Sequence, residues 1–456
     1  MPTDDELVKL LKGAAARLAR SRWSGDKGAK DLELRELFRL FEDGKAVCFA
    51  AVFSFPPSMT RYFAPFFSAP ELMEAEADRR FIEFAVGAIC SGLKIRGRAS
   101  TLRWEGPLIS PGKVRSVEKL GGDTTNAVVK FKLGKARAVF KSYRTVDEFN
   151  PEPELLSHLS AKGSRTTPNV LGAVSLAPDG PDGRAGRQIT LGLLTGFASG
   201  VPAFPAFVGN ARRSMQRKLS PHDCMPARLG IALGDLHHLL STRGAPPDIR
   251  PEAISAADID RWRMAMKARF EDAHRGLPPE KAVRLEKARP PFEQLLSGMD
   301  EWAGARKLRT HQDLHLGQVL ISRGGFKLLD FEGEPLRNGP ERIEKLPPER
   351  DVATMLRSFS YAVAVALKEL KVKDAVLLER ARRWEHDTAS SFVEGYLSAC
   401  PRAVRKRGKK RLLSAAHIWM AEKALYEIAY EARFRPEWVD IPLEGLLRLL
   451  EPVIQP

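Results

Sequence analysis

The first hundred residues combine one helical pattern of apolar positions with two strand-like runs. Thr3 followed by Glu6 is a capping box, and leucines at helical spacing behind it predict a helix to about Ser21. Three further elements follow from the same kind of pattern: strands at 46–55 and 60–67, and a helix at 81–93. Residues 1–98 are therefore expected to form a small α+β module.

Strands dominate the prediction for residues 99–198. Apolar runs bounded by turn residues predict strands at 114–120, 127–133, 136–143 and 189–194. The stretch 195–205 is rich in small residues and proline, and it predicts a linker. A second unit made mostly of sheet is expected to end there.

From residue 199 to residue 456 the apolar period is mainly helical. Six long helices are predicted, at 227–240, 257–273, 279–299, 350–370, 374–399 and 414–434. One hairpin interrupts them, because 319–322 and 326–329 have strand patterns around the turn Arg323-Gly324-Gly325. The patterns together predict the α+β fold class, with a helical C-terminal part.

Composition and charge limit the possible classes of protein. Of the 456 residues, 43% are hydrophobic and 29% charged, as is usual for a globular protein. The net charge of +16 suits a polyanionic nucleotide substrate, and the basic run 402–411 has no interleaved aromatic residue for stacking on nucleic acid. Four scattered cysteines, no membrane-length apolar run and no signal pattern predict a cytoplasmic protein without nucleic-acid or membrane partners.

Two polar loops on either side of the predicted hairpin carry the groups that phosphoryl transfer needs. Asp313 stands five residues before Gln318, and a second acidic pair, Asp330 and Glu332, follows the hairpin. One carboxylate would orient the attacking hydroxyl, while a carboxylate and an amide oxygen would hold Mg²⁺. The alternative is that all four are ordinary polar loop residues, but two such loops joined by one short hairpin favour the first interpretation.

A glycine-bearing loop in the second unit is a candidate cradle for nucleotide phosphates. Its candidate residues are Gly121, Gly122, Thr124, Thr125 and Asn126. Lys141 follows inside an apolar strand, where a lysine either solubilises a sheet edge or pairs with phosphates. Glu154, at a helix start marked by proline, is the candidate acid that fixes Lys141.

Three segments resemble the protein-kinase-like sugar and antibiotic kinases, and more narrowly the bacterial maltokinases. They are His-x-Asp-Leu-His-Leu-Gly-Gln with Asp-Phe-Glu-Gly-Glu-Pro, the segment 345–359, and the segment 422–443 with its Lys-Ala-Leu-Tyr-Glu run. The resemblance implies a bilobal protein-kinase-like fold with an N-terminal cap module (1–98), a nucleotide-binding N-lobe (99–198) and a mainly helical C-lobe (199–456). It covers nearly the whole chain and is specific from about Arg309 onward.

The same resemblance implies ATP-dependent phosphorylation of maltose at its anomeric hydroxyl, giving maltose 1-phosphate. The implied roles are catalysis for Asp313, metal binding for Gln318, Asp330 and Glu332, and phosphate binding for Lys141 and Glu154. ATP and Mg²⁺ are the expected cofactors. A separate enzyme that interconverts trehalose and maltose is the expected metabolic partner.

The predicted C-terminal helix allows two interpretations. Lys423, Tyr426, Glu427 and Tyr430 share one helical face. They form either an amphipathic face with an ion pair between Lys423 and Glu427, or a platform where rings stack on a sugar and charged groups bind its hydroxyls. The platform, together with His311 of the catalytic loop, makes up the expected substrate contacts.

Two departures from the family pattern leave the acceptor open. Gln312 replaces the glycine usual between the histidine and the aspartate, and Thr195-Gly196 stands where relatives often have a Gln-Glu pair. The alternative function is a kinase of the same scaffold for glucosamine, trehalose or an aminoglycoside. A nucleic-acid-binding pseudo-enzyme is the alternative from another class, but the complete set of acidic groups argues against it.

Overall fold

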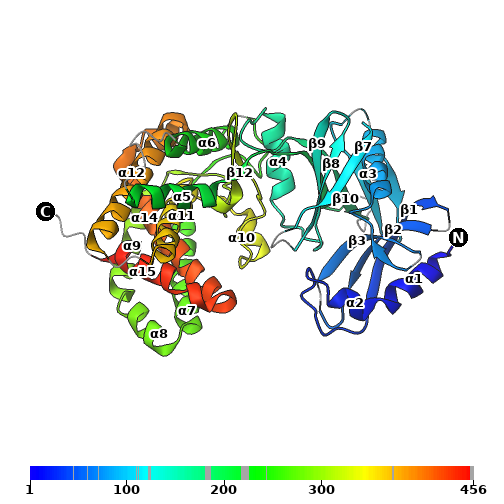
Figure 1. Cartoon of the computed structure of the whole chain (residues 1–456), viewed down its shortest axis with the longest axis horizontal. Coiled ribbons are helices and arrows are strands. Elements are labelled where there is room, and N and C mark those ends of the chain that lie inside the picture. The colour runs from blue at the N-terminus through cyan, green and yellow to red at the C-terminus, as the bar shows by residue number, and fades with distance from the viewer. Residues whose placement is uncertain are drawn as a thin grey trace. The chain divides into compact units, whose positions relative to one another are not determined.

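The chain is described by a computed structural model that places all residues except 45, 59, 70, 109, 111, 122–124, 180–185, 217–224, 243, 372–373 and 452–456. The described part forms two compact units, one of residues 1–160 with 168–198 and one of residues 161–167 with 199–456. Most strands belong to the first unit and most helices to the second (Figure 1). The predicted α+β fold class is therefore confirmed.

The first unit begins with a four-stranded antiparallel sheet. Its strands, in sheet order, are β1 (Glu33–Asp43), β2 (Ala46–Ser54), β3 (Arg61–Phe67) and β4 (Met73–Glu74). The predicted first helix is divided at Ala14 into α1 (Asp4–Gly13) and α2 (Ala15–Ala19), and its capping box of Thr3 and Glu6 is present. Strand β1 was not predicted, because its mixed apolar and charged sequence gives no clear strand signal.

Strand β2 is buried on both faces, which explains its uninterrupted apolar sequence. Phe49 and Phe53 share one core with Leu7 and Leu11 of α1. The alternate residues, such as Ala50, belong to a second core that includes α3 (Arg79–Ser91) and a larger sheet. Successive residues of a strand point to opposite faces, so both sets must be apolar.

The larger sheet of the first unit has seven strands. In sheet order they are β5 (Lys94–Arg96), β6 (Ser100–Glu105), β10 (Val170–Pro178), β11 (Ile189–Gly196), β9 (Ala136–Ser142), β8 (Ala127–Leu133) and β7 (Val114–Lys119). Phe81 of α3 packs on it, with ring centroids 6.4 Å from Trp104 and 5.8 Å from Phe140. Residues 1–98 and 99–198 thus share a core, and the boundary at residue 98 stays a prediction. Helix α4 (Glu152–Ala161) follows β9 along the chain.

The second unit is mainly helical. Its helices are α5 (Ala203–Met215), α6 (Met225–Leu240), α7 (Ala256–Gly276), α8 (Pro279–Glu286), α9 (Arg289–Ser297), α10 (Gly339–Ile343), α11 (Glu349–Glu369), α12 (Ala375–Ala399), α13 (Arg402–Arg405), α14 (Gly408–Phe434) and α15 (Asp440–Leu450). Short strands β12 (Val201–Pro202), β15 (Val319–Ser322) and β16 (Gly325–Leu328) form one sheet, and β13 (Glu252–Ala253) pairs with β14 (Arg306–Lys307). The buried side chains at the start of α11 make this helix the centre of the unit.

Proline explains two of the differences between the predicted and the observed helices. The expected helix 279–299 is divided, because Pro290 and Pro291 occupy the first turn of a new helix, α9. The expected linker 195–205 instead ends in helix α5, whose first turn accommodates Pro205. In both cases proline marks a helix start.

Candidate functional site

A short hairpin brings together the two polar loops of the second unit. Strands β15 and β16 pair antiparallel, as the turn around Gly324 predicts. Beyond them the N–H of Leu329 donates to the carbonyl of Gln318 at 2.9 Å. The pairing lets the Gln318 side chain reach Asp330, and its Nε2 donates to Oδ2 at 3.0 Å. Hydrogen bonds therefore connect the end of the first loop to the start of the second.

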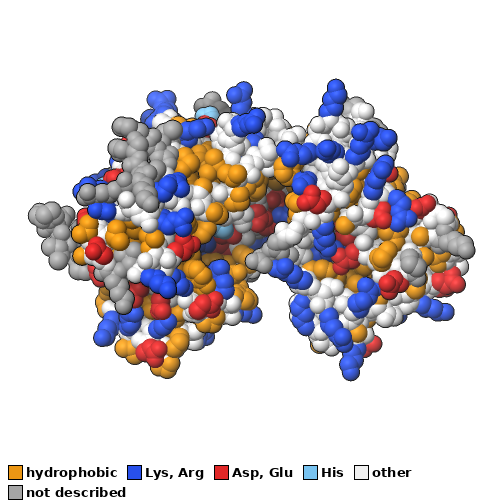
Figure 2. Space-filling model, viewed as in Figure 1, with side chains coloured by type: hydrophobic (Ala, Val, Ile, Leu, Met, Phe, Trp, Pro, Cys, Tyr) orange, Lys and Arg blue, Asp and Glu red, His pale blue; other side chains and the backbone are white. Residues whose placement is uncertain are grey.

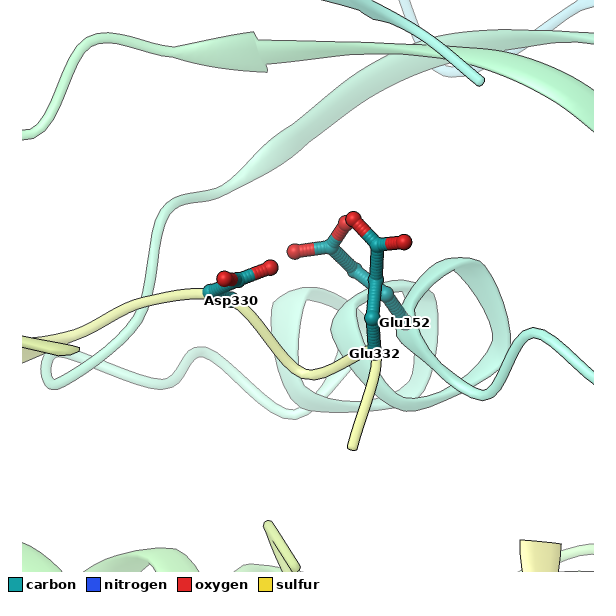
Figure 3. A group of neighbouring side chains, drawn as sticks. All are labelled: Glu152, Asp330 and Glu332. Atoms are coloured by element: carbon teal, nitrogen blue, oxygen red, sulfur yellow. The ribbon is translucent and has the colours of Figure 1, made fainter. Parts of the chain in front are cut away.

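Asp330 and Glu332 lie two residues apart on the loop that follows β16 (Figure 3). Carboxylate oxygens of the two residues come within 4.8 Å of each other. Asp330 has a left-handed backbone, with φ of 61°. Carboxylate and amide oxygens are the ligands that Mg²⁺ prefers. Asp330 and Glu332 thus offer two neighbouring carboxylates that fit a magnesium ion, and Gln318, whose side chain reaches Asp330, is the candidate for an amide ligand.

Asp351, in the first turn of α11, anchors the loop that leads to Asp313. Its buried carboxylate accepts hydrogen bonds from the N–H groups of His311 at 2.7 Å and Gln312 at 3.1 Å. His237 of α6 makes a third contact at 3.0 Å. Burial raises the pKa of Asp351, but the bond to His237 and the backbone donors hold it below its ordinary value. The anchor is therefore charged and fixes the loop backbone.

His311 connects the two loops from inside the protein. Its ring is 1% exposed and lies 4.3 Å from the ring of Phe331, measured between centroids. Its Nε2 lies 2.8 Å from the carbonyl oxygen of Leu329. A buried ring has no surface to offer a sugar, which argues against the expected substrate contact of His311 and for a bracing role.

Gln312 has the unusual backbone that its glycine counterpart suggested. Its φ is 68°, in the left-handed region, and the residue is 1% exposed. The side-chain amide compensates, because Nε2 donates to the carbonyl oxygens of Arg342 at 3.0 Å and Glu344 at 2.9 Å. The departure from glycine is thus accommodated within the same loop conformation.

Asp313 lies directly after this fixed segment, and its side chain is 15% exposed. Lys423 of α14 donates through Nζ to Asp313 Oδ1 at 3.2 Å and to Glu334 Oε1 at 2.8 Å. Burial lowers the pKa of Lys423, but the charges of Glu334 and Asp313 raise it above its ordinary value. Asp313 is thus a partly exposed carboxylate with one oxygen held by a charged lysine, an arrangement suited to accepting a proton from a bound hydroxyl.

The ion pairs of α14 differ from the expected one. Lys423 pairs with Asp313 and Glu334, whereas Glu427 accepts from Arg357 Nη2 at 2.7 Å. The expected pair between Lys423 and Glu427 is therefore wrong. The rings of Tyr426 and Tyr430 lie 6.3 Å apart with an interplanar angle of 18°. Tyr426 is buried and Tyr430 is half-buried, so the tyrosine surface on this face comes mainly from Tyr430.

In the first unit, Lys141 of β9 pairs with an acid in the first turn of α4. That acid is Glu152, at 2.6 Å from Lys141 Nζ, and Tyr143 donates to the same oxygen at 2.7 Å. The sequence favoured Glu154, but residues two apart on a helix do not share a face. Helix α4 begins at Glu152, two residues before the expected acid. Glu152, which is also labelled in Figure 3, is therefore the residue that fixes Lys141.

The loop residues expected around the phosphates are only partly described. Gly122 and Thr124 lie outside the described residues. Gly121 and Thr125 are exposed. Asn126 Oδ1 accepts from the N–H of Arg144 at 3.2 Å, so this side chain binds the backbone just after β9.

The second departure from the family pattern has a packing reason. At Gly196, the end of β11, a Cβ atom would lie 2.3 Å from Asn169 Oδ1. The Gly196 N–H also donates to the Asn169 carbonyl at 2.9 Å. Glycine is required here by the close approach of Asn169.

Four buried charged residues around Asp313 were missed by sequence reasoning. They are Glu334, Arg337, Arg350 and Glu422. The available signal was a charge at a position where the helical period predicts an apolar residue, as at Arg350 in the buried first turn of α11. This signal marks a residue as a buried charge, but it does not identify the residue with which it forms an ion pair.

Charge and hydropathy complete the description. Figure 2 shows Lys and Arg side chains spread over the visible face of each unit rather than gathered in a single patch. Among the described residues there is no helix with the length and apolar character needed to cross a membrane.

Comparison with known proteins adds a family and a fold. A sequence model of the APH family, the phosphotransferase enzyme family, matches residues 116–383. A glucosamine kinase of Streptacidiphilus jiangxiensis is 24% identical over 305 residues, covering 66% of this chain and 66% of that protein. One of Mycolicibacterium smegmatis is 27% identical over 271 residues, covering 59% and 61%. The chain therefore matches less than two thirds of the length of these relatives.

One solved structure extends the likeness to nearly the whole chain. A glucosamine kinase in complex with glucosamine, ADP and inorganic phosphate matches with a TM-score of 0.70 at 20% identity, over 98% of this chain and 99% of that one. This match, with the family match, confirms the predicted protein-kinase-like fold.

Proposed function

Since the chain belongs to the APH phosphotransferase enzyme family, we propose that it transfers the γ-phosphoryl group of ATP to a hydroxyl of a small sugar. The observation that carries the proposal is the arrangement around Asp313. A partly exposed carboxylate follows a rigid loop, and the same hairpin holds Gln318, Asp330 and Glu332 beside that loop. A catalytic carboxylate and a set of magnesium ligands are the parts that phosphoryl transfer requires.

Each residue has a distinct part in the proposed reaction. Asp313 accepts a hydrogen bond from the attacking hydroxyl and takes its proton as the bond to phosphorus forms. Lys141, fixed by Glu152, binds phosphate oxygens of the nucleotide. Gln318 and Asp330, with Glu332, would hold Mg²⁺, whose charge would offset that of the phosphates. Asp351 and His311 brace the loops that carry Asp313 and Asp330.

Glucosamine is the first acceptor to consider. Both curated relatives are glucosamine kinases, and the solved relative contains glucosamine and ADP. An amino sugar carries an ammonium group, which needs a carboxylate or another acceptor beside it. Glu427, 15% exposed on α14, is the candidate for that contact.

A neutral sugar such as maltose is the second candidate, and a specific observation favours it. The two carboxylates beside the tyrosines of α14 already have cationic partners: Glu427 pairs with Arg357, and Glu431 pairs with Arg435. Paired carboxylates attract an additional ammonium group less than isolated ones do. The ring of Tyr430 is still able to stack on a sugar face.

A direct experiment decides between the acceptors. The protein is incubated with ATP, Mg²⁺ and a panel of sugars, including glucosamine and maltose, and products are detected by mass. Asp313→Asn is expected to lower turnover by about 10²–10⁴-fold while nucleotide binding is kept. Asp300→Asn is the matched control, because the Asp300 side chain is 75% exposed. Near-normal turnover in Asp313→Asn, or no phosphorylated sugar from the wild type, would refute the proposal.

A further inference from the structure

A cluster of charged side chains is buried behind Asp313. Its members come from α7, the loop before α10, α11 and α14: Arg269, Glu334, Arg337, Arg350, Glu422 and Lys423. Glu334 and Arg350 are 0% exposed, and Glu422 is 2% exposed. Burying so many charges costs desolvation free energy that ion pairing at best offsets, so stability alone is a poor explanation for the cluster.

Glu334 connects this cluster to the catalytic loop from two sides. Through Oε1 it binds Lys423 at 2.8 Å, and Lys423 in turn binds the Asp313 side chain at 3.2 Å. Through Oε2 it binds Arg350 at 2.7 Å, and Arg350 in turn donates to the carbonyl of Gln312 at 2.5 Å. The two oxygens of one carboxylate thereby fix both the backbone before Asp313 and its side chain.

Lys423 is better placed to act on Asp313 than on a substrate. Its side chain is 7% exposed, which leaves little surface for a sugar. An ammonium group has three hydrogens, and two of them are directed at Asp313 and Glu334. A further neighbour of Nζ is the ring of Tyr426, whose centroid is 4.7 Å away.

We propose that Lys423 is a positioning residue for phosphoryl transfer, which holds the Asp313 carboxylate in the orientation that receives the hydroxyl, with Glu334 as its anchor. The proposal rests on the catalytic role of Asp313 under the proposed function. Oδ1 of Asp313 stays bound to Lys423, and Oδ2, which lies 3.9 Å from His315 Nε2, accepts the hydrogen bond of the acceptor hydroxyl. Without Lys423 the carboxylate rotates among several orientations, and few of them are productive.

The test compares Lys423→Met with Lys409→Met, measured with whichever sugar the wild type phosphorylates. Lys409 lies on the same helix, and its side chain is 45% exposed in an ion pair with Glu394. Lys423→Met is expected to lower kcat by about 10²-fold, with the KM values for sugar and ATP changed less than about 3-fold. Lys409→Met is expected to match the wild type. Lys423→Arg, which keeps a cation, is expected to recover part of the lost kcat.

A second comparison identifies the residue through which Lys423 acts. Lys423→Met is also made in the Asp313→Asn background, where no carboxylate remains to be oriented. The effect on kcat is then expected to disappear, because coupled residues are not additive. ADP binding, measured by calorimetry, reports whether each variant is folded.

The outcomes separate the two proposals. A raised KM for sugar with unchanged kcat in Lys423→Met would make Lys423 a substrate contact and overturn the positioning role. The positioning role would also be overturned if Lys423→Met lowered kcat by the same factor in the wild-type and in the Asp313→Asn background. Inactive Asp313→Asn beside fully active Lys423→Met would overturn only the positioning role. Active Asp313→Asn would remove the catalytic assignment itself and, with it, this inference.

Discussion

Replacing Gln312 by glycine and by alanine separates two opposing contributions of this residue to stability. The backbone is left-handed, with φ of 68°, which costs a non-glycine residue about 1–2 kcal/mol. The side-chain amide makes two hydrogen bonds, to the carbonyl oxygens of Arg342 and Glu344. Both variants lose these bonds, but only glycine removes the backbone cost.

The expected magnitudes follow from these two terms. Two hydrogen bonds contribute about 1 kcal/mol each, so Gln312→Ala should lower the free energy of unfolding by about 2 kcal/mol. At a positive φ glycine is better than alanine by about 1 kcal/mol, so Gln312→Gly should lower it by only about 1 kcal/mol. The order of stability is therefore wild type, then glycine, then alanine.

Tryptophan fluorescence during urea unfolding measures this order of stability for the second compact unit, which contains Gln312. Trp302 lies 5.8 Å from Trp419 and 6.3 Å from Trp262, between ring centroids, and all three belong to the second unit. A glycine variant less stable than the alanine variant would contradict the left-handed backbone. A glycine variant more stable than the wild type would show that the two amide bonds contribute too little to offset the backbone cost.

Three other expectations concern metal, pH and packing. Asp330→Asn should raise the Mg²⁺ concentration needed for half-maximal activity, and an unchanged magnesium titration would contradict its role as a ligand. Burial raises the pKa of Asp258, but hydrogen bonds from Lys307 and others bring it well below the ordinary 3.8. The carboxylate therefore stabilises the folded state above that pH and loses this effect as pH falls. Asp258→Asn should flatten the decline of the urea midpoint as pH falls from about 5 to about 3. A Cβ atom at Gly230 would lie 2.0 Å from a carbonyl oxygen of α12, so Gly230→Ala should lower Tm, whereas Gly87→Ala, with nothing within 4 Å, should not.

Elements with strong local signals were predictable from the sequence. The strand 127–133 was predicted at its observed bounds, because apolar residues alternate there and Gly134 supplies the positive φ of the turn. The hairpin of β15 and β16 followed from the same signals, and it places Asp330 beside Gln318. The grouping of the proposed metal ligands was thus accessible from sequence, since short-range structure determines it.

Partners of charged residues were not predictable in the same way. The helical period correctly put Lys423 and Glu427 on one face, but each residue pairs with a group from elsewhere in the chain. Lys423 binds Glu334 and Asp313, which are 89 and 110 residues distant in sequence. Glu152 was missed in favour of Glu154 because the start of a helix is uncertain by one or two residues. Spacing gives the face of a helix, whereas tertiary packing decides what that face meets.

Backbone strain and buried charge point to the same part of the molecule. Among the described non-glycine residues, φ is positive at Ser116, Gln312, Asp330 and Lys371, and two of these four lie in the loops of the proposed site. Such conformations cost about 1–3 kcal/mol each and persist where surrounding contacts determine them. Around Gln312 those contacts are the bonds to Asp351 and Arg350, both of which are fully buried. Asp351 and Arg350 therefore hold the strained loop in the conformation that presents Asp313, in addition to forming ion pairs with other buried residues.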